Sequence, residues 1–289
     1  MLKIKKRMRW LYVPAVMLML CFILYPLARG AIISLFKWNG YSQNMKFVGL
    51  DNYINMFQDS NFKSSFWNTM LYGFGSAFLQ NTFGLALALL ADQKFRTNKL
   101  LRTLVYLPVM ISGLIMGYIM QFFFQYNHGV INEILAWFHI EPIDWLSDSI
   151  RGKIIITLVN SWQYVGICMI VYMAGLQNIP RMYYEAASLD GGNWWDVFCN
   201  VTLPLLTPAI TTAVITNVIG GLKLTDVIVS LTNGGPVQRT HSLSTYISYM
   251  YFDAEKGGYA SAIGIFLFVF IYLVSTVLTR SFEKREVQY

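Results

Sequence analysis

The feature that most constrains this chain is a set of six apolar stretches, each long enough to cross a bilayer as a helix. A crossing takes roughly 20 predominantly apolar residues. A bilayer offers no partner to an unpaired backbone N–H or C=O group, so we expect every crossing segment to be helical. The predicted fold is an all-α membrane protein with one transmembrane domain over residues 1–289. Its predicted spans lie near residues 10–36, 66–91, 103–126, 154–177, 203–229 and 260–279.

Composition agrees with this class. Hydrophobic residues make up 55% of the chain and charged residues 13%, at the apolar and weakly charged end of the range for soluble domains. Glycines inside the predicted spans suit close helix packing or local unwinding. These glycines are Gly113, Gly117, Gly166, Gly175, Gly220 and Gly221.

Basic residues predict the orientation, because loops on the cytoplasmic side carry an excess of Lys and Arg. With six spans, three basic regions fall on one side, and we expect that side, with both termini, to be cytoplasmic. The regions hold Lys3, Lys5, Lys6, Arg7 and Arg9; Lys94, Arg96, Lys99 and Arg102; and Arg280, Lys284 and Arg285. The net charge of +7 is then a consequence of topology and does not indicate a nucleic-acid partner.

The first 30 residues have the basic start and apolar run of a signal peptide. The run is long, however, and ends in Tyr25-Pro26-Leu27-Ala28-Arg29 with no clear small-x-small cleavage site. We therefore expect a retained first span.

The sequence contains none of the common catalytic or metal-binding motifs. There is no GxxxxGK[ST] phosphate loop, no nucleophile elbow and no zinc motif, so we expect a non-catalytic chain without metal or cofactor. The three histidines lack metal-ligand spacing. The cysteines are expected to be packing residues. They are Cys21, Cys168 and Cys199, and the histidines are His128, His139 and His241.

The loop at residues 178–202 carries the most specific pattern. Pro180 suits the first turn of a helix, and Gly191 suits its end. Asn193 can cap a second short helix over residues 194–198. Small residues at 186–188 let a partner approach closely. The string is Glu185-Ala186-Ala187, three residues, Gly191, nine residues, then Val201-Thr202-Leu203-Pro204.

This string resembles the EAA loop of permease subunits of ATP-driven importers, with Val201 in place of the usual isoleucine. The resemblance implies a cytoplasmic coupling helix that docks on a separate ATPase subunit, which binds ATP and Mg²⁺. The implied coupling residues are Glu185, Ala186, Ala187, Asp190, Gly191, Leu203 and Pro204.

Further segments look like the carbohydrate branch of these permeases, similar to the maltose, lactose and glycerol-phosphate systems. They cover residues 47–53, 102–108, 231–236 and 258–263. The chain lacks the large external insertion of the maltose-system subunit. The resemblance implies a bacterial-type cell membrane and four partners: a second, homologous permease in a heteromeric pair, two ATPase subunits and an extracytoplasmic sugar-binding protein.

Polar residues in two predicted spans are candidates for the substrate pathway. On a helix Asn160, Gln163 and Tyr164 share a face. By resemblance, Asn160, Tyr164 and Ile167 match sugar-contact positions, and a second contact region falls at residues 220–224. That region reads Gly-Gly-Leu-Lys-Leu, which argues against maltose. The predicted pathway residues are Asn160, Gln163, Tyr164, Asn217, Gly220, Gly221, Lys223, Leu224 and Asp226.

Lys223 allows two interpretations. A charge deep in a bilayer costs about 2.5–3.5 kcal/mol, so Lys223 should face protein or water. It either pairs with Asp226, three residues on, near the outer boundary, or lines the substrate path, where it could meet an anionic sugar.

Three alternatives to a sugar importer stay open at this point. The same importer class could carry glycerol phosphate, a peptide or an amino acid. An ion-coupled secondary transporter would usually keep carboxylates or unwound half-helices at mid-membrane, and these spans have almost none. A membrane-embedded assembly subunit would show no ATPase stimulation by any solute.

Overall fold

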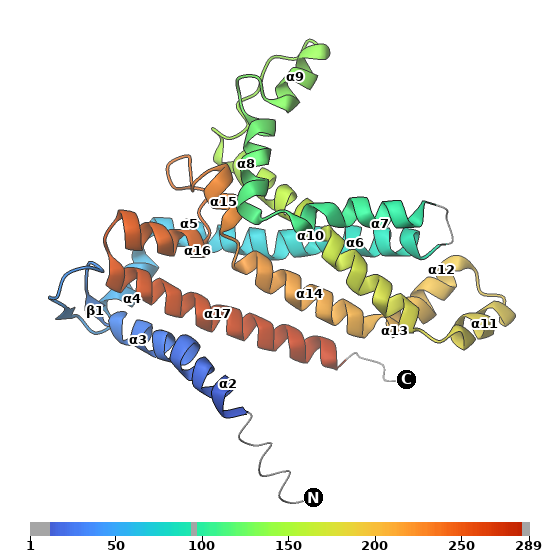
Figure 1. The fold of residues 1–289 in the computed structure, drawn as a ribbon, viewed down its shortest axis with the longest axis horizontal. Coiled ribbons are helices and arrows are strands. Elements are labelled where there is room, and N and C mark those ends of the chain that lie inside the picture. The colour runs from blue at the N-terminus through green and yellow to red at the C-terminus, as the bar shows by residue number, and fades with distance from the viewer. Residues whose placement is uncertain (1–11, 94–96, 285–289) are drawn as a thin grey trace, which may run out of the picture. The chain divides into compact units, whose positions relative to one another are not determined.

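The computed structural model describes residues 12–93 and 97–284 (Figure 1). The basic cluster at residues 3–9, the predicted start of the first span at residue 10, and Lys94, Arg96 and Arg285 lie outside this part. The described chain is helical apart from one small β-ribbon, which confirms the predicted all-α class. It forms two compact units, which take in residues 1–62 with 246–269 and residues 63–245 with 270–289.

The first unit contains the N-terminal helices, the ribbon and the beginning of the last helix. Its elements are α2 (Tyr12–Met19), η1 (Leu20–Leu24), α3 (Tyr25–Ile33), β1 (Phe36–Lys37), β2 (Lys46–Phe47) and α4 (Asp51–Gln58). The start of α5 (Ser60–Met70), the end of α16 (Leu243–Ser248), η5 (Tyr249–Asp253) and the first half of α17 (Gly257–Glu283) complete it.

The second unit contains the remaining helices. They are η2 (Leu71–Gly75), α6 (Ser76–Asp92), α7 (Asn98–Tyr106), η3 (Leu107–Met110), α8 (Gly113–Phe124), α9 (Val130–Trp137) and α10 (Ser149–Asn178). They continue with α11 (Arg181–Leu189), α12 (Trp194–Val197), η4 (Phe198–Thr202), α13 (Leu203–Leu205), α14 (Thr207–Leu222) and α15 (Asp226–Leu231).

Four of the predicted spans are continuous helices, and the other two are bent. The continuous ones are Tyr12–Ile33, Ser60–Asp92, Ser149–Asn178 and Gly257–Glu283. The predicted third span bends by 100° between Met110 and Gly113, and the fifth bends by 67° between Leu205 and Thr207. The described chain therefore offers six crossings if each bent pair is one span.

Proline accounts for both bends, since it removes a backbone donor and clashes with the preceding turn. Pro108 lies in the 3₁₀ turn before the first bend, and Ser112 then caps α8 by accepting from the N–H of Ile115 at 3.4 Å. Pro208 is the second residue of α14. The predicted span 203–229 is not a single helix, because α14 ends at Leu222 and α15 is separate.

Helix α10 packs against α6, α7 and α14 in the second unit, and half of its residues are buried (Figure 1). The predicted close packing at glycines is confirmed here. A Cβ added to Gly166 would lie 2.7 Å from the carbonyl oxygen of Val105, and one added to Gly175 would lie 2.6 Å from the Cβ of Ala209. Gly220 differs, because no heavy atom lies within 4 Å of an added Cβ.

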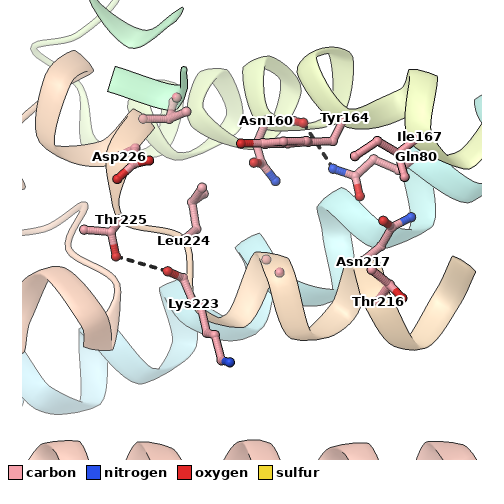
Figure 2. Close-up of a pocket in the computed structure, with 14 residues that line it drawn as sticks. Gln80, Asn160, Tyr164, Ile167, Thr216, Asn217, Lys223, Leu224, Thr225 and Asp226 are labelled. Atoms are coloured by element: carbon pink, nitrogen blue, oxygen red, sulfur yellow. Dashed lines mark hydrogen bonds between the residues drawn. The ribbon is translucent and has the colours of Figure 1, made fainter. Parts of the chain in front are cut away.

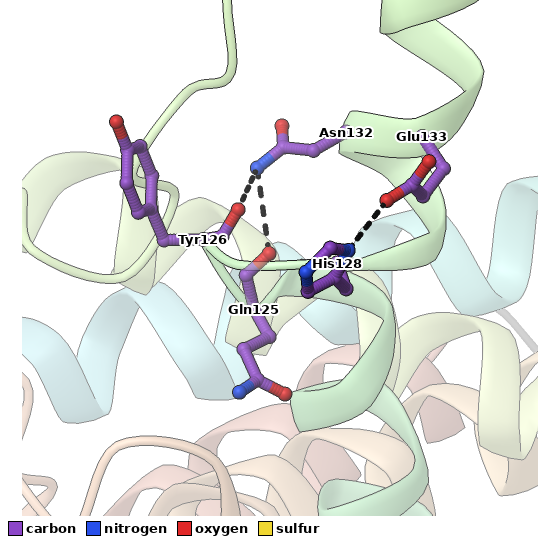
Figure 3. A network of polar contacts seen from close by, with 5 residues as sticks. All are labelled: Gln125, Tyr126, His128, Asn132 and Glu133. Carbon is purple, nitrogen blue, oxygen red and sulfur yellow. Dashed lines mark hydrogen bonds and ion pairs between the residues drawn. The ribbon is translucent and has the colours of Figure 1, made fainter.

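The loop before α10 is closed by one buried amide. Asn132, 5% exposed, donates to the carbonyl oxygens of Tyr126 at 3.1 Å and Ile143 at 3.0 Å, and accepts from the indole N–H of Trp145 at 2.9 Å. The neighbouring pair of His128 and Glu133, 3.1 Å apart, is exposed (Figure 3).

We predict that Asn132→Ala lowers the stability of the purified chain. The substitution leaves partly buried backbone groups and the indole N–H of Trp145 without partners, and a fully buried group in that state costs about 1–3 kcal/mol. Thermal unfolding in detergent should show a clear fall in midpoint. His128→Ala is the matched control in the same loop and should have little effect, because exposed ion pairs contribute about 0–1 kcal/mol. Equal shifts for the two variants would contradict the role given to Asn132.

Candidate functional site

A cavity of about 430 Å³ lies in the second unit among α6, α8, α10, α14 and the segment that joins α14 to α15 (Figure 2). It is lined by Gln80, Gly113, Asn160, Tyr164, Ile167, Thr216, Asn217, Gly220, Gly221, Lys223, Leu224, Thr225, Asp226 and Val227. Eight of the nine predicted pathway residues are in this set. The ninth, Gln163, is not.

Helix α10 supplies one wall. Asn160, Tyr164 and Ile167 project from it toward α14, and the side chain of Gln80 on α6 donates to the backbone oxygen of Asn160 at 3.1 Å (Figure 2). Asn160 and Gln80 are both buried. The amide of Asn160 is therefore held on a fixed stretch of backbone, with its side chain turned toward the cavity.

Gln163 has a different position from its predicted partners. Its side chain is completely buried, and its Nε2 donates to the carbonyl oxygen of Ile111 at 2.9 Å. Successive helical residues are rotated by about 100°, so positions three and four after Asn160 fall on opposite sides of it. The cavity lies on the side of the helix that carries Tyr164, whereas Gln163 supports the bend between η3 and α8.

The opposite wall is the end of α14. The helix stops at Leu222, and the next residues form a bent segment whose backbone is fixed. The hydroxyl of Thr225 donates to the oxygen of Lys223 at 3.0 Å, and the buried hydroxyl of Ser242 donates to that of Leu224 at 2.7 Å. Close packing also restrains the end of α14, because a Cβ added to Gly221 would lie 2.7 Å from the backbone oxygen of Tyr72.

Lys223 and Asp226 both line the cavity and are exposed, and no ion pair joins them. Figure 2 shows the Lys223 side chain directed away from Asp226. Asp226 starts α15, where the helix dipole favours a carboxylate. The sequence allowed Lys223 either to pair with Asp226 or to line the substrate path. The structure shows no contact between the two side chains.

Sequence reasoning missed five of the lining residues: Gln80, Gly113, Thr216, Thr225 and Val227. Gln80 carried a usable signal, because a polar side chain inside an apolar span needs a protein partner or water. Gly113 reaches the cavity through the bend before α8, and Thr225 and Val227 reach it through the break between α14 and α15.

The loop after α10 forms a second candidate site. Helix α11 ends in a Schellman motif, in which the N–H of Gly192 donates to Ala187 at 3.0 Å and that of Gly191 donates to Ser188 at 3.2 Å. Gly191 has φ +78°, a conformation that suits glycine. Asn193 and Asp196 form a capping box that starts α12. The predicted pair of short helices is confirmed.

This pair of helices has one packed face and one free face. Tyr183 and Tyr184 pack against the core around Met173 and Leu176. Glu185 and Ala186 are exposed, whereas Ala187 and Pro204 are half-buried. Exposed on the same pair of helices and the turn after them are Met182, Leu189, Trp194, Trp195, Asp190, Gly191 and Leu203.

Among the described residues, no group of three or more His, Cys, Asp or Glu side chains could hold a metal ion. The three cysteines are free, and only Cys168 is a buried packing residue; Cys21 is exposed and Cys199 is half-buried.

Comparison with known proteins identifies the family of this chain. The family described as "Binding-protein-dependent transport system inner membrane component" matches residues 80–288. "Probable starch degradation products transport system permease protein AmyD" of Thermoanaerobacterium thermosulfurigenes is 32% identical over 281 residues, which cover 96% of this chain and 95% of that protein. "Lactose transport system permease protein LacF" of Rhizobium radiobacter is 36% identical over 244 residues, covering 82% and 81%.

A solved structure shares the fold. It is a chain of a bacterial alginate ABC transporter in complex with an alginate pentasaccharide-bound periplasmic protein, with a TM-score of 0.83, 24% identity, and coverage of 96% of this chain and 93% of that one. The chain therefore belongs to the family of inner-membrane components of binding-protein-dependent transport systems, as a multi-pass permease of an ATP-binding-cassette importer.

Proposed function

We propose that this permease moves a sugar or oligosaccharide into the cytoplasm after delivery by an extracytoplasmic binding protein. The observation that carries the proposal is the 430 Å³ cavity, which gathers eight pathway residues that are spread over 67 positions of the sequence, from 160 to 226. Its volume lies within the range of roughly 300–1,000 Å³ that is usual for small-molecule sites.

The chemistry of the lining suits a sugar. The amides of Gln80, Asn160 and Asn217 can both donate and accept, as sugar hydroxyls do. Tyr164 and Thr216 add hydroxyl groups. Ile167, Leu224 and Val227 offer apolar surface to the carbon framework of the ring.

The exposed face of α11 and α12 suits the proposed coupling role. The Schellman motif and the capping box make these helices a compact projection, and Tyr183 and Tyr184 join it to the core of α10. We propose that a separate ATPase subunit docks there and binds ATP and Mg²⁺. The complex would contain two such subunits and a second, homologous permease. Closure of the ATPase dimer would move α11, and with it α10, to open the pathway outward.

A non-sugar solute is the second candidate. It is favoured by the unpaired Lys223 and Asp226, which present opposite charges to one cavity and so suit an amino acid or short peptide. A ligand screen on the purified cognate binding protein separates the two, since only one solute class should bind tightly.

We predict that both termini and the α11–α12 loop are cytoplasmic, as the positions of the basic residues indicate. A reporter fused after Tyr289 should be active in the cytoplasm, and a cysteine at Asn233 should be labelled from outside. An external tail, or labelling of position 233 from the cytoplasm alone, would reverse the orientation.

We predict that Glu185→Lys and Ala186→Trp reduce co-purification of the ATPase subunit roughly tenfold, a change of about 1.4 kcal/mol. Both residues are exposed, so the variants should still insert and keep their thermal midpoints. Gly191→Asp should also lose coupling, because its φ of +78° strains a side chain by about 1 kcal/mol. Glu133→Lys, another exposed carboxylate, is the control for charge. Normal association and uptake in all three variants would defeat the coupling role.

We predict that Asn160→Ala and Lys223→Ala change solute-stimulated ATPase activity in proteoliposomes. Loss of one hydrogen bond to the solute costs about 0.5–1.5 kcal/mol, which is roughly a 2- to 10-fold rise in the half-saturating concentration. Lys63→Ala is the control, as an exposed lysine outside the cavity. Wild-type values across several sugars for both variants would remove these residues from the pathway.

A further inference from the structure

A second cavity, of about 1080 Å³, lies within the first unit. The β1–β2 ribbon, α4 and the start of α17 surround it, at the end of the unit where Figure 1 labels β1 and α4. Its walls carry three lysines, Lys37, Lys46 and Lys256. The proposed solute pathway uses none of these residues.

Two of the lysines are forced together by the ribbon. Phe36 pairs with Phe47 across it, and their rings meet edge to face with centroids 5.4 Å apart. Neighbouring residues of a strand point to opposite faces, so the partners Lys37 and Lys46 lie directly opposite each other on the other face. Like charges in such a pair destabilise a ribbon.

Hydrogen bonds from neighbouring segments hold the ribbon in place, so the two lysines cannot easily move apart. The N–H of Gly258 donates to the oxygen of Trp38 at 3.0 Å. The buried amide of Asn52 donates to the oxygens of Ser34 at 2.8 Å and Phe36 at 3.0 Å. The loop is thus fastened on both sides of β1.

The cavity walls also carry three carboxylates, those of Asp51, Asp59 and Glu255. Asp59 accepts from the hydroxyls of Tyr246 at 2.6 Å and Tyr259 at 2.8 Å. Burial raises the pKa of Asp59, but these two donors and the backbone N–H of Asn61 outweigh it and hold the pKa below its usual value. Asp51 stabilises the first turn of α4. Among the described residues, none of the three lysines forms an ion pair.

We propose that Lys37 and Lys46 form a docking contact for an acidic segment of the solute-binding protein. The inference rests on the proposed function and on the predicted external position of residues 37–65. A carboxylate group placed between the two ammonium groups would replace their repulsion by attraction. Complementary charge of this kind acts mainly on the rate of association and makes it depend on salt.

The test uses the assembled transporter in proteoliposomes with the binding protein that stimulates its ATP hydrolysis. Lys37→Glu and Lys46→Glu should each raise the half-saturating concentration of binding protein roughly tenfold at low salt. The double variant should show a flatter dependence on salt than wild type. Lys63→Glu, an exposed lysine outside this cavity, makes the same change of charge and should leave half-saturation unchanged.

Lys46→Gln separates docking from folding. It removes the like-charge pair, so the thermal midpoint should stay the same or rise while the half-saturating concentration increases. Unchanged half-saturation and salt dependence in the Lys37 and Lys46 variants would overturn the inference, as would equal losses in Lys63→Glu. If no binding protein stimulates the wild-type transporter, the proposed function fails instead, and the two failures are therefore distinguishable.

Discussion

The close approach of neighbouring helices to α10 is the constraint on which the second unit depends. Side chains normally keep helix axes 8–10 Å apart, and glycine permits closer packing of backbones. Gly84 on α6 faces Cys168, and Gly166 and Gly175 on α10 face Val105 and Ala209. These contacts come from three different partners of one helix. They fix the register of α6, α7 and α14 along α10, and this register decides which side chains meet at the cavity.

The helix bends follow from the same arrangement. A straight α8 would continue along α10, whereas the bend after Met110 directs it to α15 instead. The contact there is tight, because a Cβ on Gly113 would lie 2.8 Å from the Cβ of Asp226. Gln163 stabilises the bend from within α10 by donating to Ile111. Gln163, which was predicted to touch substrate, thus supports the bend between η3 and α8 and does not line the cavity.

Local signals made the α11–α12 loop predictable from sequence. Pro180, Gly191 and Asn193 each act through the backbone within a few residues. The structure places Pro180 and Asn193 as N-caps and Gly191 directly after the C-cap Asp190. The presence of a polar cavity was predictable, because polar residues in apolar spans need partners. Its outline was not, because Gln80 and Gly113 reach it through contacts between helices far apart in sequence. Gly220 was predicted as a pathway residue and lines the cavity, where it has open space beside it.

That open space has an evolutionary consequence. Gly220 lines the cavity, yet an added side chain there would meet no other heavy atom within 4 Å, and in a helix other residues are more stable than glycine by up to about 1 kcal/mol. Its neighbour Gly221 has no such freedom against Tyr72. In the solute pathway that we propose, a single codon change at position 220 would therefore alter the lining without a steric clash. On that proposal, the descendants of a duplicated gene would have a short route to new cargo.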